Sequence, residues 1–106
     1  MHRAVVPALL LICTVPALAE GPTITIAIRD HQFVPSEVPV QAGVKVELII
    51  RNEQATPAEF ESTSMHREKV VPAGAATSVF IGPLTPGRYE FFDDFHPATH
   101  GVILVQ

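Results

Sequence analysis

Short runs of alternating apolar and polar residues, separated by proline and glycine, fill most of the chain after residue 19. Ile24, Ile26 and Ile28 alternate with small or polar residues, and this period of two is typical of strands with one buried face. Further strand-like runs follow at 38–40, 44–50, 59–62, 70–71, 75–81, 89–92 and 102–105. Because no helix-length amphipathic pattern occurs and ten prolines and six glycines punctuate the chain, the pattern predicts an all-β sandwich.

The first nineteen residues have the pattern of an export signal. His2 and Arg3 give a short positive start, residues 4–18 are apolar, and Ala17 and Ala19 form an A-x-A cleavage site. No later apolar run is long enough to cross a bilayer. We therefore predict a cleaved signal peptide at 1–19, one domain at 20–106, and a periplasmic location.

The only cysteine, Cys13, lies inside the predicted signal. A lipoprotein signal is disfavoured because Ile12 stands where a small residue is needed. Residues 20–106 therefore have no thiol for a disulfide or a metal. They carry six lysines and arginines against eleven acidic residues, a net charge of about −5, which argues against nucleic acid and suits cations or a basic partner.

The C-terminal segment 87–105, GRYEFFDDFHPATHGVILV, holds the densest candidate chemistry. Its strand-like runs flank a predicted loop with Asp93, Asp94, His96 and His100. This order resembles the end of the cupredoxins, where a cysteine follows the aromatic strand and a histidine comes a few residues later. The strand parity puts Asp93 at the cysteine position, and this argues against a blue-copper site, which needs a His2Cys ligand set.

Two further motifs support the resemblance. The run FVPSEVPVQAGVKV at 33–46, with Asn52 after it, is similar to the first half of a cupredoxin, and LTPGRY at 84–89 is similar to the approach to its metal loop. The resemblance implies a single cupredoxin-like Greek-key β-sandwich.

A narrower resemblance is to the EfeO-type cupredoxin-like proteins of bacterial iron uptake. It rests on FES at 60–62, REK at 67–69, IGPL at 81–84 and FFDDFH at 91–96. It implies a periplasmic protein that binds an iron or copper ion. The sequence leaves both a monomer and a dimer open. Its expected partner is an inner-membrane iron permease or another periplasmic metal protein, with oxidation of ferrous iron as a further possibility.

His96 is the best single ligand candidate, because a cupredoxin places it at one end of the sandwich and neutral imidazole binds iron, copper and zinc. Asp93 and Asp94 are adjacent and face opposite ways in a strand, so only one can join His96. Parity favours Asp93, whereas Asp94 is favoured if the strand ends early or bulges. His100 fits the broader cupredoxin pattern but not the narrower group, and His31 is expected in a surface turn.

Glu59 and Glu61 lie where cupredoxins place their first ligand, and both fall on one face if this segment is a strand. The iron-uptake resemblance favours Glu61 and the loop geometry favours Glu59. Met65, His66 and Glu68 form a second group in the polar segment 63–69, for which we predict a single helical turn. Packing is the preferred role of Met65, since methionine readily fills gaps in a core.

One or two histidines with several carboxylates form a hard ligand set that suits Fe(II), Fe(III), Mn(II) or a non-blue Cu(II) site. Three hypotheses follow: a metal-binding accessory protein of iron uptake, a small ferroxidase or cuproxidase, and a cupredoxin-shaped interaction domain without metal. Turnover separates the first two, because an enzyme consumes ferrous iron in large excess over protein.

Overall fold

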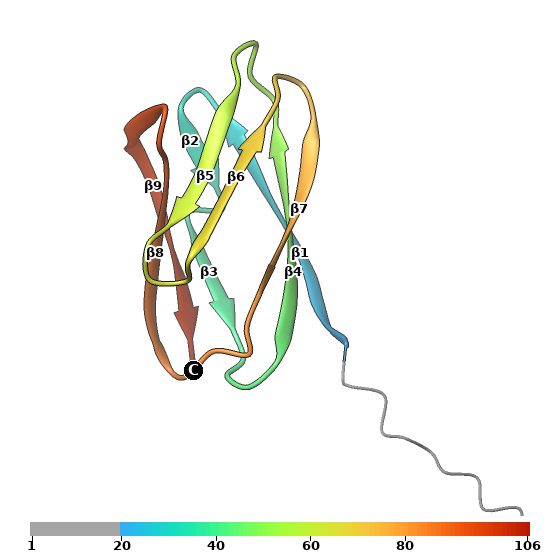
Figure 1. Ribbon diagram of the computed structural model, residues 1–106, viewed down its shortest axis with the longest axis vertical. Helices are drawn as coiled ribbons and strands as arrows, with labels where there is room; N and C mark the ends of the chain where they lie inside the picture. Colours follow the sequence, from blue (N-terminus) through green and yellow to red (C-terminus); the bar gives the residue numbers. More distant parts are fainter. Residues whose placement is uncertain (1–19) are drawn as a thin grey trace, which may run out of the picture.

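The computed structural model describes residues 20–106, so the predicted signal peptide at 1–19 lies outside the described residues. The described part is built from strands and turns and contains no helix (Figure 1). Its strands are β1 (Glu20–Arg29), β2 (Gln32–Val34), β3 (Glu37–Val40), β4 (Lys45–Asn52), β5 (Ala58–Ser62), β6 (Arg67–Val71), β7 (Ala76–Ile81), β8 (Gly87–Asp93) and β9 (His96–Val105). No helix within 20–106 is long and apolar enough to cross a membrane.

The strands form two sheets that pack face to face. One sheet has four strands in the order β2-β1-β4-β7, and the other has five in the order β3-β9-β8-β5-β6. The pairs β1–β4 and β3–β9 are parallel, and the remaining pairs are antiparallel. The predicted all-β sandwich is confirmed, and the alternation of Ile24, Ile26 and Ile28 lies within β1.

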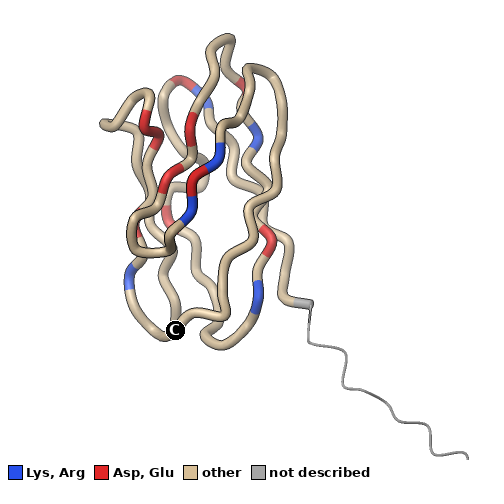
Figure 2. The backbone as a smooth tube through the Cα atoms, viewed as in Figure 1, with Lys and Arg blue, Asp and Glu red and all other residues tan. Residues whose placement is uncertain are grey.

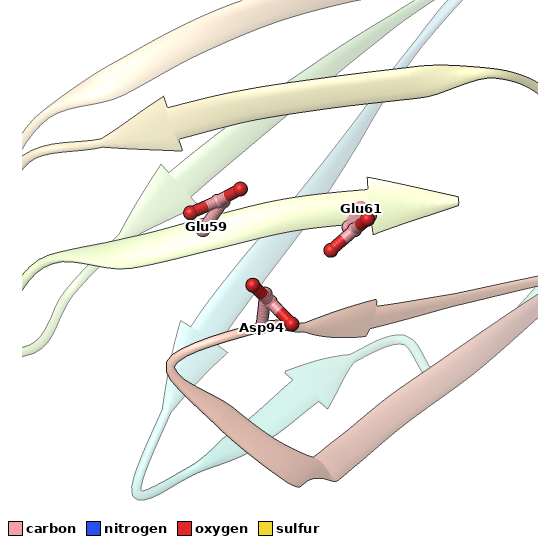
Figure 3. A group of neighbouring side chains, drawn as sticks. All are labelled: Glu59, Glu61 and Asp94. Carbon is pink, nitrogen blue, oxygen red and sulfur yellow. The ribbon is translucent and has the colours of Figure 1, made fainter. Parts of the chain in front are cut away.

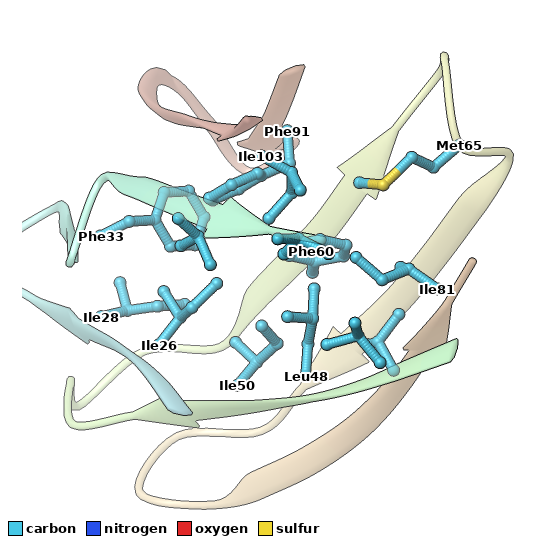
Figure 4. Packing of buried hydrophobic residues seen from close by; sticks show 14 of the residues in the cluster. Ile26, Ile28, Phe33, Leu48, Ile50, Phe60, Met65, Ile81, Phe91 and Ile103 are labelled. Carbon is cyan, nitrogen blue, oxygen red and sulfur yellow. The ribbon is translucent and has the colours of Figure 1, made fainter. Parts of the chain in front are cut away.

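Aromatic rings form the centre of the core between the two sheets (Figure 4). Phe60 and Phe91 are fully buried and stack with ring centroids 5.2 Å apart, and Phe33 meets Phe91 edge-on at 4.8 Å. Both geometries are favourable for aromatic pairs. Because Phe60 and Phe91 come from β5 and β8, this packing fixes the part of the five-stranded sheet whose opposite face carries acidic side chains.

Asn52, at the end of β4, ties the two sheets together through its buried side chain. Its amide Nδ2 donates to the carbonyl of Thr56 at 2.8 Å and of Val71 at 3.1 Å, and its Oδ1 accepts from the Gln54 amide at 3.0 Å. A fully buried amide needs such partners. Asn52 thereby holds the turn that leads into β5.

Two predictions about local structure are wrong. The segment 93–100 is not a loop, because β8 continues to Asp93 and β9 begins at His96, which leaves only Asp94 and Phe95 in the turn. Backbone pairing across this hairpin overrides the loop expected from proline and charge. The segment 63–69 has a turn at 63–66 and then enters β6, so the helical turn predicted there is replaced by a hairpin between β5 and β6.

Candidate metal centre

Three carboxylates converge on the outer face of the five-stranded sheet. One carboxylate oxygen each from Glu59, Glu61 and Asp94 lies within 4.8 Å of the others. Figure 3 shows Glu59 and Glu61 on β5 and Asp94 at the start of the β8–β9 turn, with their carboxylates directed toward a common space. We call these three residues the carboxylate cluster.

The strand pattern explains how this cluster forms. Phe60 points into the core, so Glu59 and Glu61 on either side of it point outward, as the sequence predicts for one strand face. The register of β8 and β9 shifts between Phe92 and Asp93, and the amide of Asp94 donates to the carbonyl of Glu59 at 2.9 Å. This backbone bond holds Asp94 beside the two glutamates.

The electrostatics of the cluster are those of like charges at close range. Hydrogen bonding and charge from Glu68, desolvation, and the charges of Asp94 and Glu61 raise the pKa of Glu59 to about 7. Desolvation and the charges of Asp94 and Glu68 raise the pKa of Glu61. Glu68 lies opposite Glu61 in the β5–β6 pairing, and Figure 2 shows the acidic positions of β5 beside β6, where basic positions flank the acidic one. A bound cation would remove this repulsion.

Asp93 lies on the other side of the sheet from the cluster. Its side chain is only 1% exposed, and its Oδ1 accepts from the amides of Glu59 at 2.9 Å and Phe95 at 3.0 Å. Within residues 20–106 its Oδ2 has no hydrogen-bond partner. The imidazole of His96 lies close by, with 3.6 Å between its Nδ1 and Asp93 Oδ2. The prediction that Asp93 and Asp94 face opposite ways is confirmed.

The structure keeps Glu68 beside the carboxylate cluster and separates Met65, His66 and His100 from it. Met65 is buried in the hydrophobic core, in agreement with the packing role preferred from sequence. His66 is exposed in the β5–β6 turn, and its carbonyl accepts from Arg67. His100 is exposed on β9 opposite Phe92, and its Nδ1 lies 2.9 Å from the carbonyl of Ala98.

His31 is a candidate that sequence reasoning left in a surface turn. It does lie in the β1–β2 turn, but its ring centroid is 4.6 Å from that of His96. The two residues are far apart in sequence, and no local pattern signals their contact. The contact between the two histidines becomes visible only in the folded structure, where the β1–β2 and β8–β9 turns lie close together.

Comparison with known proteins identifies relatives of the whole domain. The profile of the cupredoxin-like domain matches residues 2–105. An uncharacterized protein of Rickettsia prowazekii (strain Madrid E) is 46% identical over 83 residues, which cover 77% of this chain. The match covers 66% of that protein's own length, just under two thirds.

Several solved structures share the fold. The metal-binding domain of the Cu(I)-exporting P-type ATPase of Streptococcus pneumoniae D39, solved with Cu(I), superposes with a TM-score of 0.71 at 20% identity, covering 85% of this chain and 91% of that one. Auracyanin A of Chloroflexus aurantiacus gives 0.69 at 16% identity, covering 81% and 100%. Amicyanin of Paracoccus versutus gives 0.62 at 19% identity, covering 79% and 81%. At these identities the likeness concerns the fold.

Proposed function

Because the chain belongs to the cupredoxin-like domain family, we propose that it is a metal-binding protein that holds a hard cation on the carboxylate cluster. The observation that carries this proposal is the convergence of Glu59, Glu61 and Asp94 within 4.8 Å. Carboxylate oxygens at this spacing repel one another unless a cation or protons lie between them. The pKa of Glu59 is raised to about 7, first by a hydrogen bond with Glu68 and by desolvation, and then by the charges of Glu68, Asp94 and Glu61.

A blue-copper centre does not fit the residues present. Residues 20–106 contain no cysteine, and Asp93 stands at the position that the cupredoxin resemblance gives to the thiolate. Blue-copper sites need a trigonal His2Cys set. The carboxylate cluster offers hard oxygen ligands instead, which favour iron or manganese over Cu(I).

The proposed biological role is that of a periplasmic accessory protein in iron uptake, which delivers iron to an inner-membrane permease. The narrower sequence resemblance at 60–62 and 91–96 supports this role, and the acidic cluster supports it chemically. Anionic oxygen ligands stabilise Fe(III) more than Fe(II) because their charge interacts more strongly with the higher oxidation state. Iron is here the cargo, and copper is the alternative ion.

The experiment that tests the proposal is an anaerobic calorimetric titration of the purified protein with Fe(II), Mn(II) and Cu(II). We expect one equivalent of Fe(II) or Mn(II) to bind the wild type, and the double variant Glu59→Gln/Glu61→Gln to lose this binding. Glu37→Gln is the matched control, because Glu37 is an exposed carboxylate on β3, three strands away from β5.

Three outcomes decide between the functions. Stoichiometric binding lost only in the double variant supports a carrier. Consumption of Fe(II) in large excess over protein in the presence of oxygen would indicate that the protein is a ferroxidase and not a carrier. Equal binding by the wild type and the double variant overturns the carboxylate cluster as the site, and the absence of binding above a weak surface level favours a cupredoxin-shaped interaction domain without metal.

A further inference from the structure

We propose that the outer face of the five-stranded sheet docks an arginine-bearing segment of a partner protein, and that one arginine side chain enters a pocket between β8 and β9. This pocket has a volume of about 340 Å³ and is lined by Glu90, Phe91, Phe92, Pro97 and His100. We call it the β8–β9 pocket. None of the five lining residues belongs to the carboxylate cluster, so the docking proposal does not depend on metal binding.

An irregularity in the pairing of β8 with β9 accounts for the pocket. Phe92 pairs with His100, and the next residue of β8, Asp93, pairs with His96. Residues 97–99 of β9 therefore lie between two successive pairs, where β8 has no extra residue, and a bulge of this kind bends the strand away from its neighbour. The bulged segment contributes Pro97 to the lining, beside Phe92 of the neighbouring strand.

The pocket opens on the outer face of the sheet. Phe91 is fully buried in the core, so its neighbours Glu90 and Phe92 point outward. His100 shares this face because it lies directly opposite Phe92. Residues 20–106 form only two layers, and no third layer covers this face (Figure 1). A partner can therefore reach the pocket from solvent.

The polar side chains of the pocket offer hydrogen-bond acceptors. His100 Nδ1 lies 2.9 Å from the carbonyl oxygen of Ala98, and since a carbonyl can only accept, the imidazole proton is on Nδ1 and Nε2 keeps its lone pair. The Glu90 carboxylate is also an acceptor, and within residues 20–106 it forms no ion pair. A side chain that only donates hydrogen bonds therefore complements both groups.

Arginine is the side chain that fits this lining best. Its guanidinium group carries N–H donors and no acceptor, and its planar fork can pair with the Glu90 carboxylate through two hydrogen bonds. The same planar group stacks on an aromatic ring such as that of Phe92. The methylene stem of arginine can lie along apolar surface, which Phe92 and Pro97 supply here. A guanidinium is also more weakly hydrated than an ammonium, which favours arginine over lysine in a pocket.

The charge of the surrounding face also favours a basic partner. Within residues 20–106 the strand registers place one basic residue, Arg88, on this face against six acidic ones: Glu37, Glu59, Glu61, Glu68, Glu90 and Asp94. A face with charges of mainly one sign attracts and orients a partner of the opposite sign. Because Phe92 lies opposite Glu61 in the β5–β8 pairing, a segment docked in the pocket would lie beside the carboxylate cluster.

The backbone on which Glu90 lies is held from both sides. Ser62 Oγ donates to the carbonyl of Glu90 at 2.7 Å, and Glu90 pairs with Val102 of β9. A surface that is already ordered before binding loses less conformational entropy when a partner docks. The pocket is therefore preorganised for a side chain that enters it.

The test is an NMR titration of the isotope-labelled, metal-free protein with the peptide acetyl-Gly-Arg-Gly-Arg-Gly-amide. A matched peptide carries citrulline in place of both arginines, because citrulline has the same shape and no charge. We expect saturable shifts of the backbone amides of Glu90, Phe92 and His100 with the arginine peptide. The citrulline peptide should bind at least about tenfold more weakly, since its hydrogen bonds to Glu90 lack the positive charge.

Three variants test the roles of the lining residues. Glu90→Gln should weaken binding of the arginine peptide about tenfold, because the charged acceptor is lost. Phe92→Leu keeps an apolar side chain but removes the aromatic face, and should weaken binding about threefold. Glu47→Gln is the matched control, since Glu47 is a half-buried carboxylate on β4 in the other sheet, and it should leave binding unchanged. Circular dichroism of each variant checks that it folds.

Three results would overturn the docking proposal. One is equal weakening by Glu90→Gln and Glu47→Gln, which would indicate a general attraction of cations to an acidic protein. Another is equal affinity for the arginine and citrulline peptides. The third is a titration in which the amides of Glu90, Phe92 and His100 do not shift. None of these results bears on the carboxylate cluster, because Glu90→Gln leaves that cluster intact and should bind Fe(II) or Mn(II) like the wild type.

Discussion

Metal affinity at the carboxylate cluster should depend steeply on pH between 5.5 and 8.5, because a metal ion and a proton compete for Glu59. The pKa of Glu59 is raised to about 7 by Glu68, desolvation and the neighbouring carboxylates. At that pKa the side chain is charged in about 97% of molecules at pH 8.5 and in about 3% at pH 5.5. The apparent dissociation constant should therefore rise about 30-fold as the pH falls over this range.

An ordinary glutamate would behave differently. With a pKa near 4.3 it stays more than about 90% charged at pH 5.5, so the affinity would change by only about 10%. The assay is calorimetric titration with Mn(II), which does not change oxidation state and prefers oxygen ligands. Glu59→Gln is the control, since its amide does not titrate and its weaker binding should vary much less with pH.

A nearly constant Mn(II) affinity from pH 5.5 to 8.5 in the wild type would refute this reasoning. It would mean that Glu59 is ionised throughout, and hence that the hydrogen bond with Glu68, desolvation and the neighbouring charges do not raise its pKa. A steep slope that persists unchanged in Glu59→Gln would place the titrating ligand elsewhere, and Glu61 would be the first residue to replace.

Three further predictions concern the fold that supports the cluster. The metal-free protein should be more stable to urea at pH 5.5 than at pH 8, because the pKa of Glu59 is raised in the folded state and stability is lost as the pH rises toward 7. Glu59→Gln should reduce this difference in stability. A free energy of unfolding that instead rises with pH would contradict the prediction. Asn52→Ala should lower the free energy of unfolding by about 3 kcal/mol, because the buried hydrogen bonds of the Asn52 side chain are lost. A decrease below about 1 kcal/mol in urea denaturation would show that these hydrogen bonds contribute little to stability. Phe60→Ala should cost about 3–5 kcal/mol in the same assay, whereas exposed Phe95→Ala should stay within about 0.5 kcal/mol, so equal losses would count against the assigned core.

Much of the strand pattern could be predicted from the sequence, because burial on one face imposes a period of two. Ile24, Ile26 and Ile28 identified β1 in this way, and the same period put Glu59 and Glu61 on one face of β5. The sequence also separated Asp93 from Asp94. These predictions succeeded because each depends only on neighbouring residues.

The arrangement of the site could not be predicted in the same way. The loop expected at 93–100 is mostly strand, since pairing between β8 and β9 determines the length of the turn and local composition does not. The contact between His31 and His96 depends on two turns from different sheets meeting at one end of the sandwich. Asp94 rather than Asp93 joins the glutamates because β5 pairs with β8 with Phe60 opposite Asp93, which puts Asp94 beside Glu59, and this pairing between distant segments is not visible in the sequence.

The parallel pairing of β3 with β9 has a consequence for how the molecule folds. Val38 pairs with Ile103, and Val40 with Val105, so within residues 20–106 β3 gains its one partner strand only when the last residues of the sequence are available. Such long-range pairings slow folding, because the entropy of closing the intervening chain is lost before the contacts form. The domain therefore folds after the chain is complete, on a timescale of about milliseconds to seconds for such β topologies. The carboxylate cluster includes Asp94 from the β8–β9 hairpin, so an incomplete chain that lacks this hairpin cannot assemble the cluster.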